Sequence, residues 1–227
     1  YTKLGMAALL PHKALEIAED YKVLVDGSFC DDLKQREAIL KSYVPNSRCV
    51  QFDDIKTMKR DDLRQIVIGM EVVYVYHNQI DARGDKLNTE NEVFIACSEA
   101  IDEIYGLIKK LAVSANTYHF IVTVDHGFIY KRDKITESDK ISNSTSKGAF
   151  INRRFVISEN AIVDDGVLSE PLGQVLGNDD NRIVSFPAGS NVFKVAGGGQ
   201  NYVHGGSSPQ ELIIPVIDDK TERGHME

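Results

Sequence analysis

The stretch Tyr118–Gly127, with the sequence YHFIVTVDHG, decides the predicted fold. Its residues up to Val124 are mostly β-branched or aromatic and carry almost no charge, which predicts a strand buried on both faces. Gly127 is expected to let the backbone turn sharply after this strand. Asp125 and His126 would then project from the C-terminal end of a central strand, where open α/β sheets place their ligands.

The Asp125-His126 pair has two interpretations. An oxygen ligand beside a nitrogen ligand suits a divalent metal such as zinc or manganese. Alternatively, Asp125 caps a helix and His126 covers the end of the strand, which would make the pair structural. The Asp-His-Gly tripeptide alone does not distinguish a metal site from a structural turn. The surrounding elements are needed to decide between these interpretations.

A second apolar run, Glu71 to Tyr76, precedes the clearest helix of the chain, Thr89 to Ala115. The residues Thr89-Glu90-Asn91-Glu92 predict a capping box, and apolar side chains recur in the helix with a 3.6-residue period. Together with the strand at 118–124, these elements predict a βαβ unit with parallel strands. The ends of both strands would then lie on one edge of the sheet.

Ligand-type side chains follow the first of these strands as well. Asp81 and Asp85 should therefore converge with Asp125 and His126, although both could also be turn carboxylates around Gly84. We interpret His77, at the end of the same strand, as a residue that supports a ligand rather than as a ligand itself.

Two further candidates lie near the ends of the chain. Thr2 is a hydroxyl residue at the start of a predicted helix, and it is either a nucleophile or an ordinary N-cap. Metal coordination and a helix N-terminus would both favour its alkoxide. His204 precedes two glycines and is either a metal ligand or a surface histidine. Two metals about 3.5–4 Å apart would need several such carboxylates and imidazoles.

Composition limits the function classes. The 227 residues suffice for one large or two small domains, and 42% apolar with 26% charged residues is typical of a globular protein. A net charge of −8 excludes a broad basic surface for duplex DNA, but metal-binding carboxylates still attract phosphate esters. No run approaches the ~18 apolar residues of a membrane span. The three cysteines lack ligand spacing, which fits a cytoplasmic protein.

The sequence pattern changes after Tyr130. Short β-like runs separated by Gly, Asn and Asp predict an antiparallel, β-rich insertion at about 148–195. Within it, Arg153 and Arg154 are expected at a solvated strand edge, with phosphate contact as the alternative. Ser208-Pro209-Gln210-Glu211 predicts a second capping box, and 218–227 reads as a polar tail.

Four segments together resemble a known family: YTKLGMAALLPHK, VYVYHNQIDARGDK, TVDHGF and YVHGGSSPQELIIPV. They are similar to the PglZ domain of BREX-type bacterial phage-defence systems, in the alkaline phosphatase superfamily. The resemblance runs from Thr2 to about Ile217. It implies an α/β fold with a doubly wound, mostly parallel sheet and helices on both faces.

The resemblance also implies a site with two divalent metals, usually zinc, with manganese as the alternative. Thr2 matches the nucleophile, Asp125 and His126 match the ligands of the second metal, and Asp81 matches a ligand of the first. His204 matches the C-terminal metal histidine. Asp85 stands where related phosphodiesterases usually have histidine.

One expected residue has no counterpart in this sequence. The superfamily's first strand ends in an Asp ligand that precedes the nucleophile, whereas only Tyr1 precedes Thr2 here. We therefore expect residues 1–217 to form a PglZ-like domain that lacks its N-terminal strand.

These patterns predict a cytoplasmic, metal-dependent phosphohydrolase, of phosphodiesterase or nuclease-like type, that acts in phage defence. Its substrate would be a phosphoester, with nucleotides and nucleic acid as candidates, and its partners other defence proteins rather than a membrane. The alternative is a phosphatase-fold scaffold with a degraded site, which the replacement of histidine by Asp85 permits.

Overall fold

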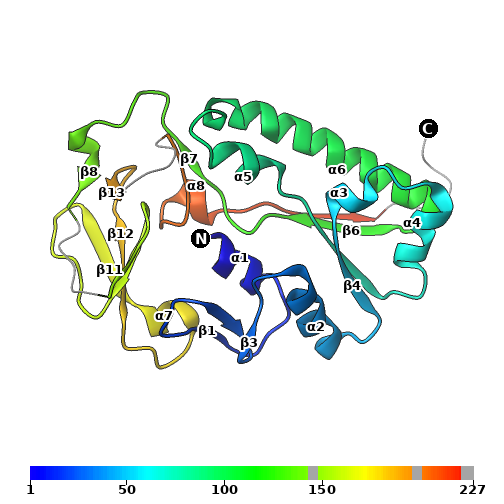
Figure 1. The fold of residues 1–227 in the computed structure, drawn as a ribbon, viewed down its shortest axis with the longest axis horizontal. Helices are drawn as coiled ribbons and strands as arrows, with labels where there is room; N and C mark the ends of the chain where they lie inside the picture. The colour runs from blue at the N-terminus through cyan, green and yellow to red at the C-terminus, as the bar shows by residue number, and fades with distance from the viewer. Residues whose placement is uncertain (143–147, 196–200, 221–227) are drawn as a thin grey trace.

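The computed structural model describes residues 1–142, 148–195 and 201–220 (Figure 1). The helices are α1 (Thr2–Ala8), α2 (Leu33–Tyr43), α3 (Phe52–Ile55), α4 (Arg60–Val67), α5 (Gln79–Gly84), α6 (Val93–Ala115), α7 (Leu172–Leu176) and α8 (Pro209–Leu212), with 3₁₀ turns η1 (Glu90–Glu92) and η2 (Glu137–Asp139). The strands are β1 (Leu15–Ile17), β2 (Val23–Val25), β3 (Ser28–Phe29), β4 (Ser47–Gln51), β5 (Val72–Tyr76), β6 (His119–Thr123), β7 (Ile129–Tyr130), β8 (Lys140–Ile141), β9 (Phe150–Ile151), β10 (Val156–Ser158), β11 (Val167–Pro171), β12 (Ile183–Pro187), β13 (Val192–Phe193), β14 (Tyr202–Val203) and β15 (Val216–Lys220).

The fold is mixed α/β, but a doubly wound parallel sheet is not confirmed. β5 pairs in parallel with β4, whereas β6 pairs antiparallel with β15, and these are separate two-stranded sheets among the described residues. The predicted strand–helix–strand order is present as β5, α6 and β6. Its two strands therefore belong to different small sheets.

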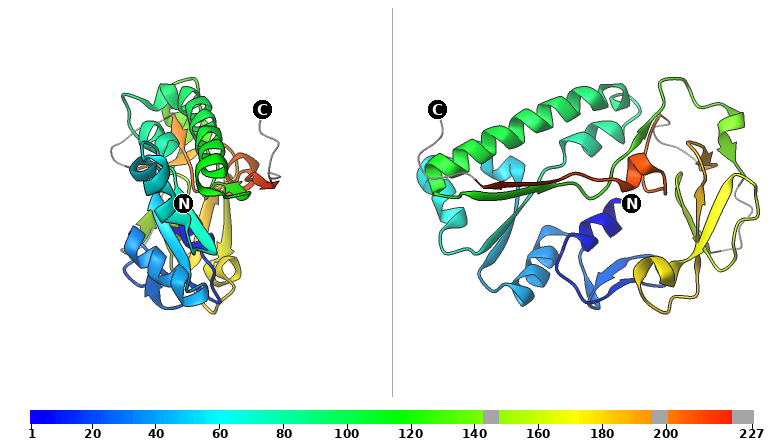
Figure 2. Two further views of the ribbon diagram at one scale, coloured as in Figure 1. Left: turned by 90° about the vertical axis from the view of Figure 1, so that its right-hand side faces the viewer. Right: turned by 180° about the vertical axis from the view of Figure 1, so that it is seen from behind.

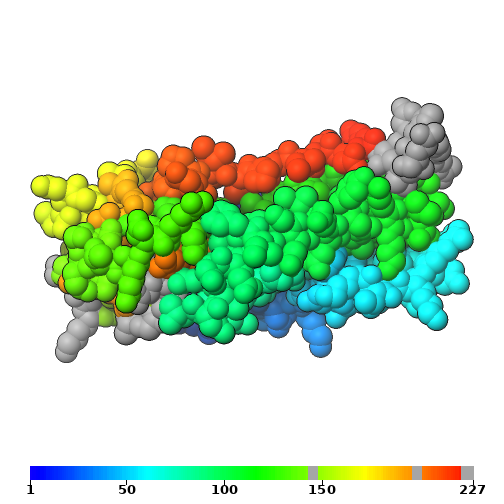
Figure 3. Space-filling model, turned by 90° about the horizontal axis from the view of Figure 1, so that it is seen from above, coloured from blue at the N-terminus to red at the C-terminus, as the bar shows by residue number. Residues whose placement is uncertain are grey.

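Helix α6 is the element that brings these two sheets together. Leu107 and Leu111 of α6 share a buried cluster with Val50 of β4, and Val75 of β5 and Phe120 of β6 pack against that cluster. Figures 1 and 2 show α6 running along β6. In the view from above, the red segment that contains β15 runs along the green segments that contain α6 and β6 (Figure 3). A single helix therefore places the ends of β5 and β6 near one another without a shared ladder.

The prediction that β6 is buried on both faces is wrong. Phe120 packs against the core under α6, but the next residue, Ile121, is 64% exposed. Because successive side chains of a strand point to opposite faces, only one face of β6 is covered in this chain.

The predicted capping box at Thr89 is also not formed. Thr89 precedes η1, and its hydroxyl donates to the carbonyl oxygen of Arg83 at 2.8 Å rather than accepting from its own turn. Glu90 is buried and accepts the backbone N–H of Asn201 at 2.9 Å. A long-range contact therefore holds this segment at Glu90, and the reciprocal hydrogen bonds of a capping box between Thr89 and Glu92 are not made.

The β-like runs downstream form a four-stranded antiparallel sheet in the order β11-β12-β10-β9. Ile157 and Val184 of this sheet share one buried cluster with Ala7 and Leu10 from the first helical segment. The sheet is thus part of the core that supports α1. β15 continues to Lys220, inside the stretch predicted as a polar tail, and residues 221–227 of that tail lie outside the described residues.

Among the helices of the described residues, none combines the length and the apolarity that crossing a bilayer requires.

Candidate metal centre

Thr2 is the first residue of α1 and points at the end of β6. Its Oγ1 lies 2.9 Å from Nε2 of His126, while Tyr1 holds the N-cap position. The approach is close, because a Cβ on Gly5 would collide with the carbonyl oxygen of Asp125. The hydroxyl of Thr2 therefore faces the candidate site, and the interpretation as an ordinary N-cap is wrong.

The imidazole of His126 is oriented by its own turn. Its Nδ1 lies 3.0 Å from the carbonyl oxygen of Gly127, an acceptor, so Nδ1 carries the proton and Nε2 presents its lone pair. Metal-binding histidines typically have such a second hydrogen bond, which fixes the tautomer. His126 Nε2 lies 3.6 Å from Oδ2 of Asp81 and 3.5 Å from Oδ2 of Asp125.

Gly127 is needed for space rather than for backbone freedom. Its φ is not among the positive values that favour glycine. A Cβ at this position would instead collide with the carbonyl oxygen of Gln210, and the Gly127 N–H donates to the Glu211 carbonyl at 2.9 Å. The segment after His126 is thus packed directly against the start of α8.

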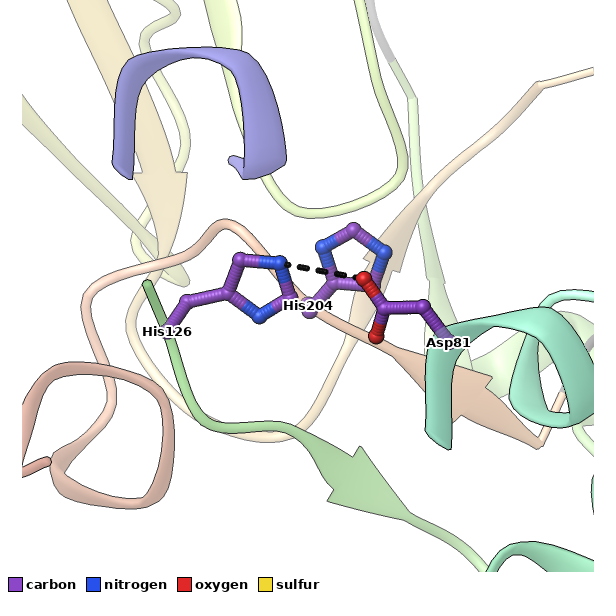
Figure 4. Close-up of side chains that lie close together, drawn as sticks. All are labelled: Asp81, His126 and His204. Carbon is purple, nitrogen blue, oxygen red and sulfur yellow. Dashed lines mark ion pairs between the residues drawn. The ribbon is translucent and has the colours of Figure 1, made fainter. Parts of the chain in front are cut away.

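Asp81, His126 and His204 converge, as Figure 4 shows. One ligand atom from each lies within 4.8 Å of the others, which is the arrangement of a candidate metal site. The rings of His126 and His204 are stacked at 4.2 Å between centroids. Asp81 comes from α5, a short helix in a stretch that the sequence analysis treated as a strand end. The predicted convergence of Asp81 with His126 is confirmed.

Asp85 and Asp125 border this group. Asp85 caps the C-terminus of α5, its Oδ1 lies 3.4 Å from Nε2 of His204, and its side chain is 58% exposed. Asp125 is more enclosed, and its Oδ2 is buried without a hydrogen-bond partner in the described structure. Asp125 is therefore better placed than Asp85 to contribute an oxygen to an enclosed cation.

The donor set fits a divalent metal. Within the described residues, Nδ1 of His204 is a second buried polar atom that lacks a hydrogen bond. Buried polar atoms are rarely left unpaired, so two of them beside three converging donors indicate a missing polar partner. Carboxylate oxygens with imidazole nitrogens suit zinc or manganese.

Electrostatics favour the metal-binding form of the histidine. Burial lowers the pKa of His126, and the neighbouring His204 lowers it further, so the ring stays neutral near pH 7. Burial raises the pKa of Asp125, and the negative charge of Asp81 adds to this, while His126 opposes it. A bound cation would relieve the repulsion between these carboxylates.

His77 has a different neighbourhood from the predicted ligands. Its Nε2 lies 2.7 Å from Oε2 of Glu103 on α6, and its ring packs 4.7 Å from that of Phe52. These contacts attach the end of β5 to α6 and α3. His77 is therefore bound to α6 and α3 rather than to the candidate ligands. The role predicted for His77, supporting a ligand, remains a prediction.

The expectation for Arg154 is wrong, because it is fully buried rather than solvated. Its Nε and Nη2 lie 3.0 and 2.7 Å from the two carboxylate oxygens of Glu211. Glu211 also accepts the N–H of Gly206, which lies two residues beyond His204, at 2.9 Å. The capping box from Ser208 to Glu211 is confirmed.

Tyr202 was not predicted as part of the site, but its hydroxyl donates to Oδ1 of Asp81 at 2.5 Å. Its position two residues before His204 was the available signal, because residues i and i+2 of a strand lie on the same face.

The chain matches the family described as the BREX system PglZ alkaline phosphatase-like domain over residues 1–218. The chain belongs to this PglZ domain family. It is 38% identical over 223 residues to the alkaline phosphatase-like protein PglZ of Bacillus cereus (strain H3081.97). It is 33% identical over 224 residues to the alkaline phosphatase-like protein BrxZ of Escherichia coli O9:H4 (strain HS).

These matches cover 98% and 97% of this chain but 26% of each relative, so the chain spans about a quarter of their length. The similarity therefore applies to one PglZ domain. Both relatives are named as alkaline phosphatase-like, which agrees with the metal-type donors at the end of β6.

Proposed function

We propose that this PglZ domain is a metal-dependent phosphohydrolase of phosphodiesterase or nuclease-like type that acts in BREX phage defence. Thr2 is the nucleophile, and the metal ligands are Asp81, Asp85, Asp125, His126 and His204. The cofactors are two divalent metal ions, zinc with manganese as the alternative. The substrate is a phosphoester, with nucleotides and nucleic acid as candidates, and other defence proteins are partners.

The observation that carries this proposal is the 2.9 Å contact between Thr2 Oγ1 and His126 Nε2. The two residues are 124 positions apart in the sequence, yet the hydroxyl of Thr2 lies within hydrogen-bond distance of the lone pair on His126 Nε2. One donor atom from each of Asp81, His126 and His204 lies within 4.8 Å of the others. An isolated N-cap threonine would have no reason to face this group.

The metals would be held by these carboxylates and imidazoles, and when bound they would lower the pKa of the attacking hydroxyl and neutralise charge on the phosphoryl oxygens. Helix α1 fixes the position of Thr2, since Gly5 packs it directly on the backbone of Asp125. Attack forms a bond from Thr2 Oγ1 to phosphorus as the bond to the leaving oxygen breaks. The hydroxyl proton passes to solvent and the leaving oxygen takes a proton from water. A second water then cleaves the bond between Thr2 Oγ1 and phosphorus, so that a diester substrate leaves as an alcohol and a phosphate monoester.

Two measurements on the intact protein test the proposal. Thr2→Ala should lower zinc- or manganese-supported hydrolysis of bis(p-nitrophenyl) phosphate by at least about 10³-fold, because it removes the covalent route. Thr57→Ala, at an exposed position, is the matched control and should leave turnover unchanged. Acid quenching during turnover should trap p-nitrophenyl phosphate esterified to the peptide that contains Thr2. Equal turnover by wild type and Thr2→Ala would end the proposal.

The exposure of Asp85 favours a second candidate, a scaffold with the phosphatase fold and a weakened site. More than half of this side chain is exposed, so it contributes little to an enclosed set of ligands. In that case the intact protein would contain no tightly bound metal after purification in zinc-supplemented buffer. Near-stoichiometric zinc or manganese, measured by elemental analysis, would exclude the scaffold and support the enzyme.

A further inference from the structure

The two oxygens of the Asp81 carboxylate have different neighbours. Oδ2 lies 3.6 Å from Nε2 of His126, on the side of the candidate metal. Oδ1 accepts a hydrogen bond of 2.5 Å from the hydroxyl of Tyr202. The carboxylate is therefore held by one oxygen while the other faces the converging donors.

Tyr202 is itself held firmly. Its ring packs against Gly84, where an added Cβ would lie 2.7 Å from the ring carbons, and its centroid lies 4.9 Å from that of Phe128. Its backbone N–H lies 3.2 Å from Oε2 of the buried Glu90. The residue is 4% exposed, so its hydroxyl has a defined position rather than a choice of solvent partners.

We propose that Tyr202 is a positioning residue that orients Asp81 for metal binding through its hydroxyl. This inference rests on the metal site of the proposed function. A ligating carboxylate on a six-residue helix such as α5 has a flexible side chain, and a fixed donor removes that freedom before the cation arrives. Partners of this kind typically contribute 10- to 100-fold in metal affinity.

The location of Tyr202 supports this role. It precedes His204 by two residues, and the two rings lie 5.7 Å apart between centroids. One short segment therefore supplies an imidazole donor and also fixes a carboxylate donor that belongs to α5.

The test is Tyr202→Phe, which keeps the ring and its packing but removes the hydroxyl. Zinc affinity of the intact protein is measured by competition with a chromophoric chelator, and cobalt substitution reports ligand geometry through its visible absorption. The matched control is Tyr74→Phe, because that half-buried hydroxyl donates to the Leu9 carbonyl at 3.0 Å. We expect Tyr202→Phe to weaken zinc binding about 10- to 100-fold and to alter the cobalt spectrum, and Tyr74→Phe to do neither.

The outcomes are distinguishable. A hydroxyl with a purely structural role would lower the melting temperature of the metal-free protein while leaving zinc affinity in the folded protein within twofold of wild type, and that result overturns the inference alone. Wild-type protein that binds no zinc, manganese or cobalt overturns the proposed metal site and the inference with it. Replacement of Tyr202 by p-aminophenylalanine, which restores a donor, should recover affinity if positioning is its role.

Discussion

The buried ion pair between Arg154 and Glu211 gives the sharpest test of the packing around the site. Their side chains are 0% and 1% exposed, and the pair is bidentate. Arg154 also donates to the carbonyl oxygens of Gly189 and Asn191. Arg154→Met removes the cation, keeps most of the side-chain volume and leaves the Glu211 carboxylate buried without its partner.

The expected cost follows from that uncompensated charge. Removing one member of a buried pair typically costs about 3–5 kcal/mol, against about 0–1 kcal/mol for an exposed pair. Unpairing the two carbonyl oxygens adds to this cost. We therefore expect about 4 kcal/mol for Arg154→Met. The double variant with Glu211→Met should be less destabilised than Arg154→Met alone, because no isolated charge remains.

Urea unfolding of the intact protein measures the free energy, and hydrogen exchange at Gly206 measures the local effect. The N–H of Gly206 donates to Glu211, so its protection should fall sharply in Arg154→Met. The control is Lys41→Met, which removes an exposed partner of Glu37. A loss below about 1 kcal/mol for Arg154→Met, or a double variant equal to the sum of the single ones, would refute the reasoning.

Three further predictions concern the same region. Gly5→Ala should destabilise the fold by about 1–3 kcal/mol and lower turnover, because its Cβ meets the Asp125 carbonyl, whereas Gly106→Ala, with open space around it, should stabilise by about 0.5–1 kcal/mol in thermal melts. Asp85→His should tighten zinc binding on the order of tenfold, about 1.4 kcal/mol by chelator competition, and unchanged affinity would show that this position holds no metal. Burial alone would raise the pKa of Glu211, but hydrogen bonds from the arginine and serine outweigh it and the net pKa is lowered. Its contribution is therefore present above the unfolded pKa of about 4.3 and is lost as pH falls through the folded value, so Glu211→Gln should show a shallower loss of stability in acid.

Chain connectivity predicted the convergence of Asp81 with His126, although the sheet it assumed is not formed. The strand–helix–strand order limits where the two strand ends can lie, and α6 packs on both strands. The direction of β15 and the separation of the two strand pairs depend on backbone pairing between distant segments. Apolar patterns predict which residues are buried, but they do not predict which strand pairs with a given strand.

The short helix α5 could not be predicted from its own residues. The stretch contains Asn78 and Gly84, which favour turns over helices, and six residues cannot form a stable helix alone. Tertiary contacts hold it instead, including the ion pair of Arg83 with Glu99 on α6. The Tyr202 ring, packed on Gly84, explains why a glycine is required inside this helix.

The same limit applies to the role of Arg154. An Arg-Arg pair beside a strand resembles a solvated edge, and only its partner, 57 residues away, makes burial tolerable. Conversely, Thr2 had a local role available as an N-cap and does not use it. In both cases a long-range polar contact overrode the local pattern, and in both cases that contact lies at or beside the candidate site.

These contacts connect the candidate ligands in series. Tyr202 holds Asp81 and lies on the segment that carries His204. Two residues beyond His204, the backbone is bound by the Glu211 side chain, and the Glu211 carbonyl accepts the N–H of the residue after His126. Tyr202 therefore holds Asp81, and Glu211 holds the residue after His126. Both contacts involve the segment on either side of His204. Loss of the Tyr202 hydroxyl and loss of the ion pair of Glu211 should therefore be non-additive in zinc affinity, because freeing this segment displaces the hydroxyl that holds Asp81.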